Sequence, residues 1–446
     1  MRTTTPRLVF TLCVLLGINT MNFFDRQVLP AVQEKIRKEW QLSDSELGWL
    51  GTAFILLYAV VGLPLGRLAD VWRRRWILAV GVGLWSLLTL GSGLAWSFWS
   101  LLVLRLGVGI GEASCAPTAT SLIGDLVPAE RRARALAVFM LGLPLGLAAS
   151  FFVSSTIAER WSWQAAFCVA GLPGLLLAVA ALFIADPVRG GADPHAQAAA
   201  THGHGVPFGA ALRRVLGLPT MWWIIASGAL HNFNMYALGT FLASFLKRYH
   251  QVSIERAGHM SGLVYGFGAL GIFAAGWLGD RAFRRGVSGR LHVAWIGLAA
   301  AIPCLFLALA APAGQIEWCA VWLMPACMLL YAYYGTVYAT IQDIIEPSLR
   351  GLAMSIYFCA MYLFGAVLGP VATGWLSDYF ARRAAAAAGS PTVTEVHRAV
   401  GLHDAMYLIP ILDAALVAVL FTAAQTVKGD YLRLRTRLEA VSSADT

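Results

Sequence analysis

Apolar residues run through the chain in twelve long stretches that polar connections separate. The stretches lie near residues 8–33, 46–69, 76–95, 98–125, 134–158, 163–185, 219–246, 256–279, 291–311, 315–343, 351–377 and 402–426. A helix needs roughly 20 apolar residues to cross a bilayer. Because backbone groups in hydrocarbon must be satisfied internally, runs of this length predict helices, and the ~10-residue alternating segments of a strand barrel are absent. The pattern predicts an all-α polytopic membrane protein with twelve transmembrane helices in two six-helix bundles.

The longest polar interruption divides the twelve stretches into two groups of six. It runs from Asp186 to Pro219 and is rich in Gly, Ala, His and Pro, which favours a flexible linker over a metal site for its three histidines. The predicted organisation has four parts: an N-terminal six-helix bundle (1–185), a cytoplasmic linker (186–218), a C-terminal six-helix bundle (219–427) and a cytoplasmic tail (428–446).

Composition supports the membrane interpretation. Only 13% of the 446 residues are charged, 58% are hydrophobic and the mean hydropathy is +0.67, whereas soluble domains carry about 25% charged residues. These values exclude soluble enzymes, disordered chains and collagen-like chains. Most of the 33 Lys and Arg residues lie at span ends on one side, which predicts that both termini and the linker face the cytoplasm. The net charge of +9 is therefore a topology signal and not a nucleic-acid footprint, and we expect a bacterial inner membrane protein.

The two groups of spans are related by an internal repeat. At a shift of 210, Gly66–Asp70 falls on Gly276–Asp280, and Asn22-Phe23 falls on Asn232-Phe233. Further along, the shift becomes 216, and Glu130 with Arg134 falls on Glu346 with Arg350. Two halves related by an in-register repeat are the plan of transporters whose halves rock around a midplane site.

Several motifs resemble known transporters. Gly66–Arg75 resembles the signature loop between spans 2 and 3 of the major facilitator superfamily. It departs from that signature at two positions, where Val71 replaces a usual basic residue and Arg73 replaces a usual glycine. Arg105–Glu112 resembles the second signature of the same superfamily. Asn22–Arg26, together with Gly111–Ser114 and Asp125-Leu126, is similar to the spinster family of lipid transporters, and anion:cation symporters share part of it. The resemblance implies alternating access, with the charged positions of spans 1 and 4 in use. Gly142–Gly146 resembles a fragment of an antiporter signature that is too short to decide antiport against symport.

Asp25 and Arg26 lie within the first apolar stretch. A charge at mid-bilayer costs about 2.5–3.5 kcal/mol, so each should face a cavity and have a partner. Adjacent helical residues point about 100° apart, so we expect each to contact groups on other helices. The alternative is a pair near the membrane face whose side chains reach the interface.

Arg105 and Glu112 are seven residues apart in span 4 and so share one helix face, separated by about 10 Å along the axis. Both can line one cavity, and the neighbouring glycines let another helix approach. A helix-end role for Arg105 and a packing hydrogen bond for Glu112 remain open. We predict that Asp25 and Glu112 exchange protonation and ion pairing with Arg26 and Arg105 during transport, because burial disfavours the ionised carboxylate and a nearby arginine favours it.

The second half offers neutral polar groups in place of these charges. Tyr331, Tyr334 and Tyr338 have the spacing of one helix face, which indicates either a ligand wall or aromatic packing. A cavity with charges on one wall and tyrosines on the other suits an amphipath. The predicted substrate cavity comprises Arg26, Arg105, Glu112, His231, Asn234, Tyr236, Tyr331, Tyr334 and Tyr338.

Charged residues at the cytoplasmic span ends predict a gate that holds the halves together, or alternatively a simple topology anchor. The gate residues are Gly66, Asp70, Arg74, Glu130, Arg134, Asp280, Glu346 and Arg350. Asp413 lies inside span 12 with no obvious basic partner.

We therefore expect a proton-coupled secondary transporter that moves a lipid-like or amphipathic organic anion, such as a lysolipid or a sphingosine-phosphate-like molecule. A symporter of small organic acids and a multidrug-type effluxer of amphipaths are the alternatives. A membrane-embedded enzyme would need HExxH, GxSxG or paired metal ligands, and ATP drive would need a nucleotide-binding loop; the sequence contains none of these. No catalytic residue, cofactor or metal is expected. The expected partners are the substrate, protons and membrane lipid, without nucleic acid, for a protein that acts as a monomer.

Overall fold

A computed structural model describes residues 5–127, 135, 138–187, 208–346 and 349–444. Every regular element within these residues is a helix. The elements, in chain order, are α1 (Thr5–Trp40), α2 (Asp44–Val71), α3 (Arg74–Ser92), α4 (Phe98–Glu112), α5 (Cys115–Leu126), α7 (Gly142–Arg160), α8 (Trp163–Ala181), α10 (Phe208–Leu216), α11 (Pro219–His250), α12 (Ile254–Phe283), α13 (Gly289–Leu309), α14 (Ile316–Ile344), α15 (Arg350–Ala360), the π-helix η2 (Met361–Ala366), α16 (Leu368–Ala387), α17 (Glu395–Met406) and α18 (Leu408–Ala444).

Each predicted span corresponds to a long helix or to consecutive helices. Among the described residues, eleven helical segments are long and apolar enough to cross a membrane. Three of these segments consist of consecutive helices: α4 with α5, α15 through η2 to α16, and α17 with α18. The 32-residue α11 occupies the position of the remaining predicted span and carries the polar residues His231, Asn232 and Asn234. The prediction of an all-α membrane protein is confirmed.

The chain forms two compact units. The first contains Met1–His204 and Gly239–Gly262, and the second contains Gly205–Leu238 and Leu263–Thr446. The boundaries therefore fall inside α11 and inside α12, so that a segment from the second half of the sequence packs with the first half. The predicted linker contains a short helix, α10, and α18 continues through most of the predicted tail.

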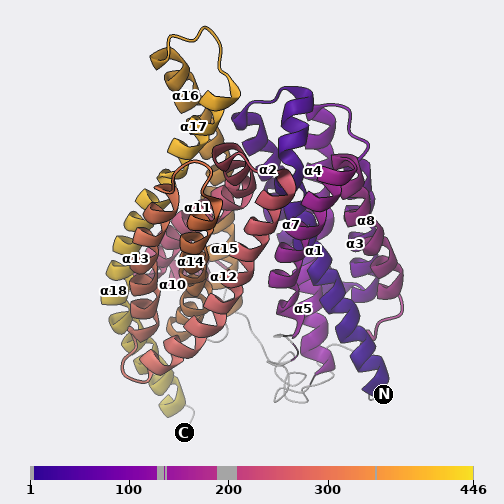
Figure 1. The fold of residues 1–446 in the computed structure, drawn as a ribbon. Helices are drawn as coiled ribbons and strands as arrows, with labels where there is room; N and C mark the ends of the chain where they lie inside the picture. The colour runs from indigo at the N-terminus through magenta and orange to yellow at the C-terminus, as the bar shows by residue number, and fades with distance from the viewer. Residues whose placement is uncertain (1–4, 128–134, 136–137, 188–207, 347–348, 445–446) are drawn as a thin grey trace. The chain divides into compact units, whose positions relative to one another are not determined.

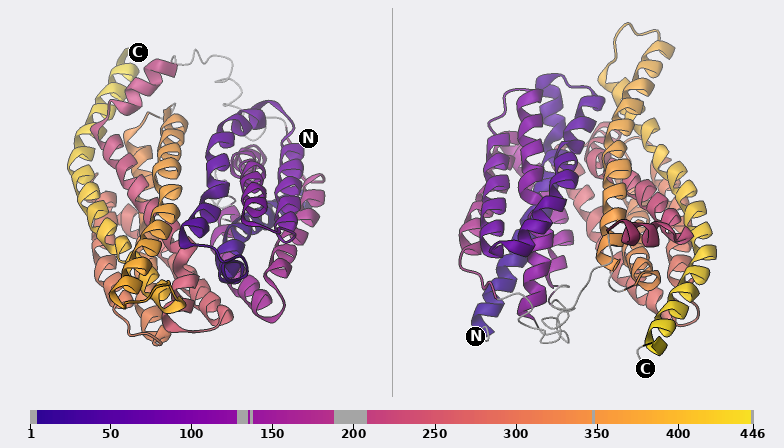
Figure 2. Two further views of the ribbon diagram at one scale, coloured as in Figure 1. Left: turned by 90° about the horizontal axis from the view of Figure 1, so that it is seen from above. Right: turned by 180° about the vertical axis from the view of Figure 1, so that it is seen from behind.

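Helices of the first unit run side by side along one common direction (Figures 1 and 2), with α1 against α7, α3 against α8 and α2 against α4. Small residues permit this close packing: a Cβ atom at Gly146 of α7 would lie 2.3 Å from the Thr20 carbonyl oxygen of α1. Buried apolar side chains that include Leu15, Trp85 and Phe139 form the core between these helices. In the second unit, α13 packs against α14 and α18, and α16 against α17.

The repeat is visible in two ion pairs, one in each unit. Arg74 at the start of α3 pairs with Asp125 at the end of α5, and Arg290 at the start of α13 pairs with Asp343 at the end of α14. Arg74 also lies 3.2 Å from Asp186. In both units an arginine that begins the third span of its half thus binds an aspartate at the end of the fourth.

Candidate functional site

Four charged side chains of α1 and α4 lie together inside the first unit, and they form two ion pairs. Arg26 Nε donates to Glu112 Oε2 at 2.9 Å, and the two side chains are 8% and 0% exposed. Arg105 Nη1 lies 3.5 Å from Asp25 Oδ1, with exposures of 1% and 2%. Asp25 and Arg26 of α1 therefore each have an opposite charge on α4, and both pairs are shielded from water.

Asp25 has further partners that position it. Thr89 of α3 donates its hydroxyl to Asp25 Oδ2 at 2.5 Å. Arg105 Nη2 also donates to the backbone carbonyl of Asp25 at 3.4 Å, so the guanidinium contacts both the side chain and the main chain of this residue. Adjacent residues of one helix point in different directions, and accordingly Asp25 contacts Thr89 and Arg105 whereas Arg26 contacts Glu112.

Aromatic rings surround the guanidinium groups. Arg26 Cζ lies 5.0 Å from the ring centroid of Phe23, 5.5 Å from that of Phe54 and 4.8 Å from that of Tyr58. Arg105 Cζ lies 5.7 Å from the centroid of Phe54. Cation–π contacts of this kind stabilise a positive charge away from water, and Phe54 of α2 is shared by both arginines.

The glycines of α4 bring the neighbouring helices close to these charges. A Cβ atom at Gly109 would lie 2.1 Å from the Phe54 carbonyl oxygen of α2, and one at Gly111 would lie 2.7 Å from the Gly81 carbonyl oxygen of α3. Any larger residue would push α2 or α3 away from α4. The glycine-rich sequence before Glu112 is thus what allows α2 and α3 to place Phe54 and Thr89 beside the ion pairs.

The arrangement couples the four groups energetically. Two carboxylates balance two guanidiniums in a water-poor interior, where an unpaired charge is far more costly than in water. If one carboxylate takes up a proton, its arginine loses the opposite charge and must find another acceptor. Within this site, each carboxylate thus balances one guanidinium, and the charges of the four groups depend on one another.

In the second unit, the predicted tyrosines of α14 belong to an aromatic cluster. Tyr331 and Tyr338 each make an edge contact with Tyr334, with ring centroids 5.7 Å apart. The His231 ring of α11 contacts the edge of Tyr334 at 4.9 Å and stacks on Tyr333 at 4.0 Å. The helix face expected from the spacing is thus lined with contacting rings.

Sequence reasoning missed three tyrosines, of which two belong to this cluster and one contacts Tyr236. Tyr333 Oη lies 2.8 Å from Ser227 Oγ and 3.0 Å from Tyr357 Oη, and the rings of Tyr236 and Tyr362 are 6.3 Å apart. The three missed residues are Tyr333, Tyr357 and Tyr362. Tyr333 stands off the face that the i, i+3, i+7 spacing defines, and the other two lie in span 11, where no local pattern marks them as neighbours of α14.

Two polar residues of the second unit point elsewhere. Asn234 donates to the Ile409 carbonyl of α18 at 3.2 Å. Asp413, one turn further along α18, is fully buried, and neither of its oxygens has a hydrogen-bond partner among the residues that the structure describes. Sequence reasoning noted Asp413 without a partner, and the structure supplies none within those residues.

The gate residues that the structure describes form contacts within their own units. Arg74 binds Asp125 and Asp186, as described above, and Arg290 Nη2 lies 2.8 Å from Asp280. Glu346 lies 3.3 Å from Arg214 of α10, and Arg350 donates to the Gln342 carbonyl at 3.0 Å. Gly66 and Asp70 lie in the helix α2, but the contacts of these two residues are outside the described part of the structure. Glu130 and Arg134 lie outside the described residues. A role for this set in holding the halves together stays a prediction.

Comparison with known proteins identifies the family. The profile of the Major Facilitator Superfamily matches residues 15–370, which is most of the chain. The chain belongs to this superfamily.

Similar proteins confirm the resemblance to the spinster family. The chain is 28% identical over 404 residues to protein spinster homolog 1 of Bos taurus, covering 83% of this chain and 73% of that one. It is 29% identical over 367 residues to a Mycolicibacterium smegmatis protein described as an MFS-type efflux pump, with 82% and 83% coverage. A crystal structure of a bacterial homolog to the human lysosomal transporter Spinster, in an inward-facing and unoccupied conformation, matches with a TM-score of 0.85 at 27% identity, covering 96% and 99%. The chain is therefore a multi-pass membrane transporter and not an enzyme.

Proposed function

We propose that the protein is a proton-coupled secondary transporter of a lipid-like or amphipathic organic anion. The main support for this proposal comes from the two buried ion pairs, Arg26 with Glu112 and Arg105 with Asp25. Ionisable residues inside a membrane are costly, and they mark substrate pathways and proton relays.

Proton coupling follows from the charge balance. When Glu112 binds a proton, Arg26 loses its partner and becomes available to an anionic group of the substrate. When the proton leaves, Glu112 regains Arg26 and the anion is released. Asp25 and Arg105 provide a second pair of the same kind, and the hydrogen bond from Thr89 supports the ionised form of Asp25.

The choice of an amphipathic substrate rests on two different kinds of side chain. The guanidiniums of Arg26 and Arg105 suit an anionic head group. The tyrosine cluster of α14 presents large apolar faces with a few hydroxyl groups, and such a surface suits an extended apolar body. We propose that these two groups of residues contact the two ends of the substrate.

A second candidate function is the efflux of varied amphipaths, which the similarity to the M. smegmatis efflux pump favours. In both cases we place the protein in a bacterial inner membrane as a monomer with cytoplasmic termini, following the distribution of Lys and Arg. The cytoplasmic span ends that carry Arg74, Asp280 and Glu346 would then act as the inner gate.

Transport by purified protein in liposomes tests the proposal. We expect a pH gradient to drive movement of a lysophospholipid or a sphingoid phosphate, and collapse of the gradient to stop it. Glu112→Gln and Asp25→Asn should abolish the proton-driven component. Undiminished proton coupling in both variants would contradict the proposed mechanism. If short organic acids compete with the transported substrate and lysolipids do not, the substrate is a small organic acid and the proposed substrate class is wrong.

A further inference from the structure

Asp413 is a buried carboxylate of the second unit that the candidate site does not use. It lies in α18, which packs against α13 and α14. Ile409, Leu416 and Leu420 share its helix face at spacings of three and four residues, and each of them is at most 2% exposed. Asp413 itself is 0% exposed. A single carboxyl group therefore lies among apolar side chains on the face of α18 that packs inside the unit.

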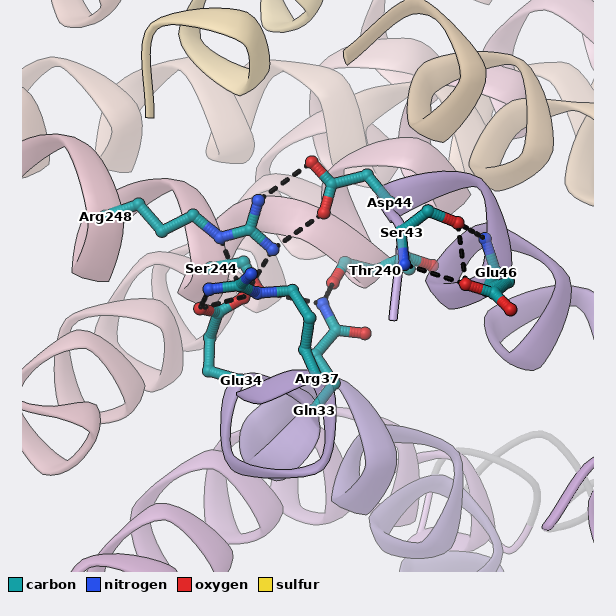
Figure 3. Close-up of polar contacts among 9 residues, drawn as sticks. All are labelled: Gln33, Glu34, Arg37, Ser43, Asp44, Glu46, Thr240, Ser244 and Arg248. Atoms are coloured by element: carbon teal, nitrogen blue, oxygen red, sulfur yellow. Dashed lines mark hydrogen bonds and ion pairs between the residues drawn. The ribbon is translucent and has the colours of Figure 1, made fainter. Parts of the chain in front are cut away.

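The other buried carboxylates of the structure have a cationic partner. Among the described residues, five further Asp and Glu side chains are buried, and each pairs with an arginine. The pairs are Asp25 with Arg105, Glu112 with Arg26, Glu34 and Asp44 with Arg248, and Asp430 with Arg433. Figure 3 shows one such arrangement, in which the Arg248 guanidinium lies between Glu34 and Asp44. Asp413 has no hydrogen-bond partner for either oxygen among the described residues, although buried charges in proteins are paired or coordinate metals.

Asn234 of α11 approaches the turn of α18 that lies next to Asp413. Its Nδ2 donates to the Ile409 carbonyl at 3.2 Å, and its Oδ1 has no partner among the residues that the structure describes. Side chains of a helix lean toward its N-terminus, so the Asp413 carboxyl extends over the turn that contains Ile409 and Pro410. Asn234 is 0% exposed. An amide oxygen and a carboxylate thus approach the same buried turn.

Pro410 adds a backbone oxygen at this turn. A proline has no N–H, so the Met406 carbonyl cannot accept the usual helical hydrogen bond from residue 410. The two helices also meet here, since α17 ends at Met406 and α18 begins at Leu408. Discontinuous helices of transporters coordinate sodium ions with backbone carbonyls of this kind. The turn therefore offers three kinds of oxygen, from a carboxylate, an amide and the main chain.

We propose that Asp413, Asn234 Oδ1 and the Met406 carbonyl bind a sodium ion inside the second unit. Carboxylate and carbonyl oxygens favour hard cations over transition metals. A single carboxylate carries one negative charge, so a monovalent cation neutralises it, whereas a divalent cation would leave a positive charge buried. At Asp413 the ion would take the part that arginine takes at the other five buried carboxylates. The site contains neither Arg26 nor Glu112, and it goes beyond the proposed proton coupling.

Binding of radioactive sodium to the purified protein in nanodiscs tests the site without substrate or a pH gradient. We expect the wild-type protein to retain a single sodium ion per molecule. Asp413→Asn should weaken binding at least about tenfold, because it removes the negative charge that attracts the ion. Asp430→Asn is the matched control. Asp430 is also a buried residue of α18 but pairs with Arg433, so this variant should bind sodium as the wild type does.

Two further variants test the other ligands and keep the result decisive if Asp413→Asn does not fold. Asn234→Val removes the amide oxygen. Pro410→Ala supplies the N–H group that the Met406 carbonyl lacks, and this hydrogen bond competes with the ion. Both variants retain Asp413, and both should weaken sodium binding several-fold. Pro410→Ala should do so without lowering the unfolding midpoint in choline chloride, because alanine favours a helix more than proline does.

Three outcomes would overturn the inference. If the wild-type protein retains no sodium, or if Asp413→Asn retains as much as the wild type, there is no sodium site and Asp413 is a protonated carboxyl group. If potassium displaces sodium at equal concentration, the choice of ion is wrong. Because no transport is measured, none of these results depends on the proposed proton-driven function.

Discussion

Arg26 of α1 and Glu112 of α4 are 86 residues apart in the sequence and form a buried ion pair with a 2.9 Å contact. The pair is surrounded by Phe23, Phe54 and Tyr58 and not by water. Neither residue can therefore change its charge without consequences for the other, and this dependence leads to the first prediction.

Arg26→Met should lower the free energy of unfolding by about 3–5 kcal/mol, because Glu112 is left as an unpaired charge in an apolar interior. The double variant Arg26→Met with Glu112→Leu should recover most of that loss, because it leaves no charge behind. Thermal unfolding in detergent measures both. A double variant as unstable as the single one would falsify the assignment of the loss to the unpaired carboxylate.

Thr89→Val should destabilise the protein by about 1.5–3 kcal/mol, the range for a hydrogen bond to a charged group. Valine preserves the shape of threonine but removes the donor to Asp25 Oδ2. Thr89→Ser retains the donor and serves as the control in the same unfolding measurement. Equal stability of the two variants would mean that the Thr89 hydroxyl does not stabilise Asp25.

Gly109→Ala should destabilise the protein and reduce transport, because the added Cβ would lie 2.1 Å from the Phe54 carbonyl oxygen and would displace the ring that contacts both arginines. Gly124→Ala is the matched control, since a Cβ there has no heavy atom of the described residues within 4 Å. In a helix this control substitution should stabilise by up to about 1 kcal/mol. The unfolding midpoint and the liposome transport rate are measured for both variants. If Gly124→Ala also lowers stability and transport, the effect of Gly109→Ala does not come from the contact with Phe54, because α4 and α5 then tolerate no added methyl group at either position.

Arg74→Met should cost more stability than Arg290→Met, although the two arginines occupy equivalent places in the repeat. Arg74 is 1% exposed and binds Asp125 and Asp186, whereas Arg290 is 15% exposed and one of its partners, Asp280, is 65% exposed. We expect a loss of about 3–5 kcal/mol for the buried site and about 1 kcal/mol for the more hydrated one. Thermal unfolding distinguishes them, and equal losses would show that burial does not set the cost.

In sodium-free buffer, Asp413→Leu should leave the protein as stable or make it more stable, by up to about 3 kcal/mol. The carboxyl group is fully buried without a hydrogen-bond partner among the described residues, and an unsatisfied buried polar group costs about 1–3 kcal/mol. Asp413→Asn, which keeps the polar group, should gain less. A lower unfolding midpoint for Asp413→Leu would indicate a partner for Asp413 outside the described residues.

The missed features show where sequence reasoning ended. No sequence pattern links Arg248 with Glu34 and Asp44, because none of the three belongs to a motif. Their contact joins residues more than 200 positions apart, and no local period relates them. Likewise, the tyrosine spacing indicated one face of α14 but could not reveal that Tyr357 of α15 lies 3.0 Å from Tyr333.

The sequence by itself determined the helical spans and the few charges inside them. Hydrophobic length and helical periodicity are local properties, so they can be read along the chain. Only the tertiary structure decided the partners: that Arg26 binds Glu112 while Asp25 binds Arg105, and that Gly239–Gly262 packs with the first half of the sequence. These contacts depend on which helix faces pack together, as the close approach of Gly109 to Phe54 shows. Because such packing involves two segments that are distant in the sequence, neither segment alone determines it.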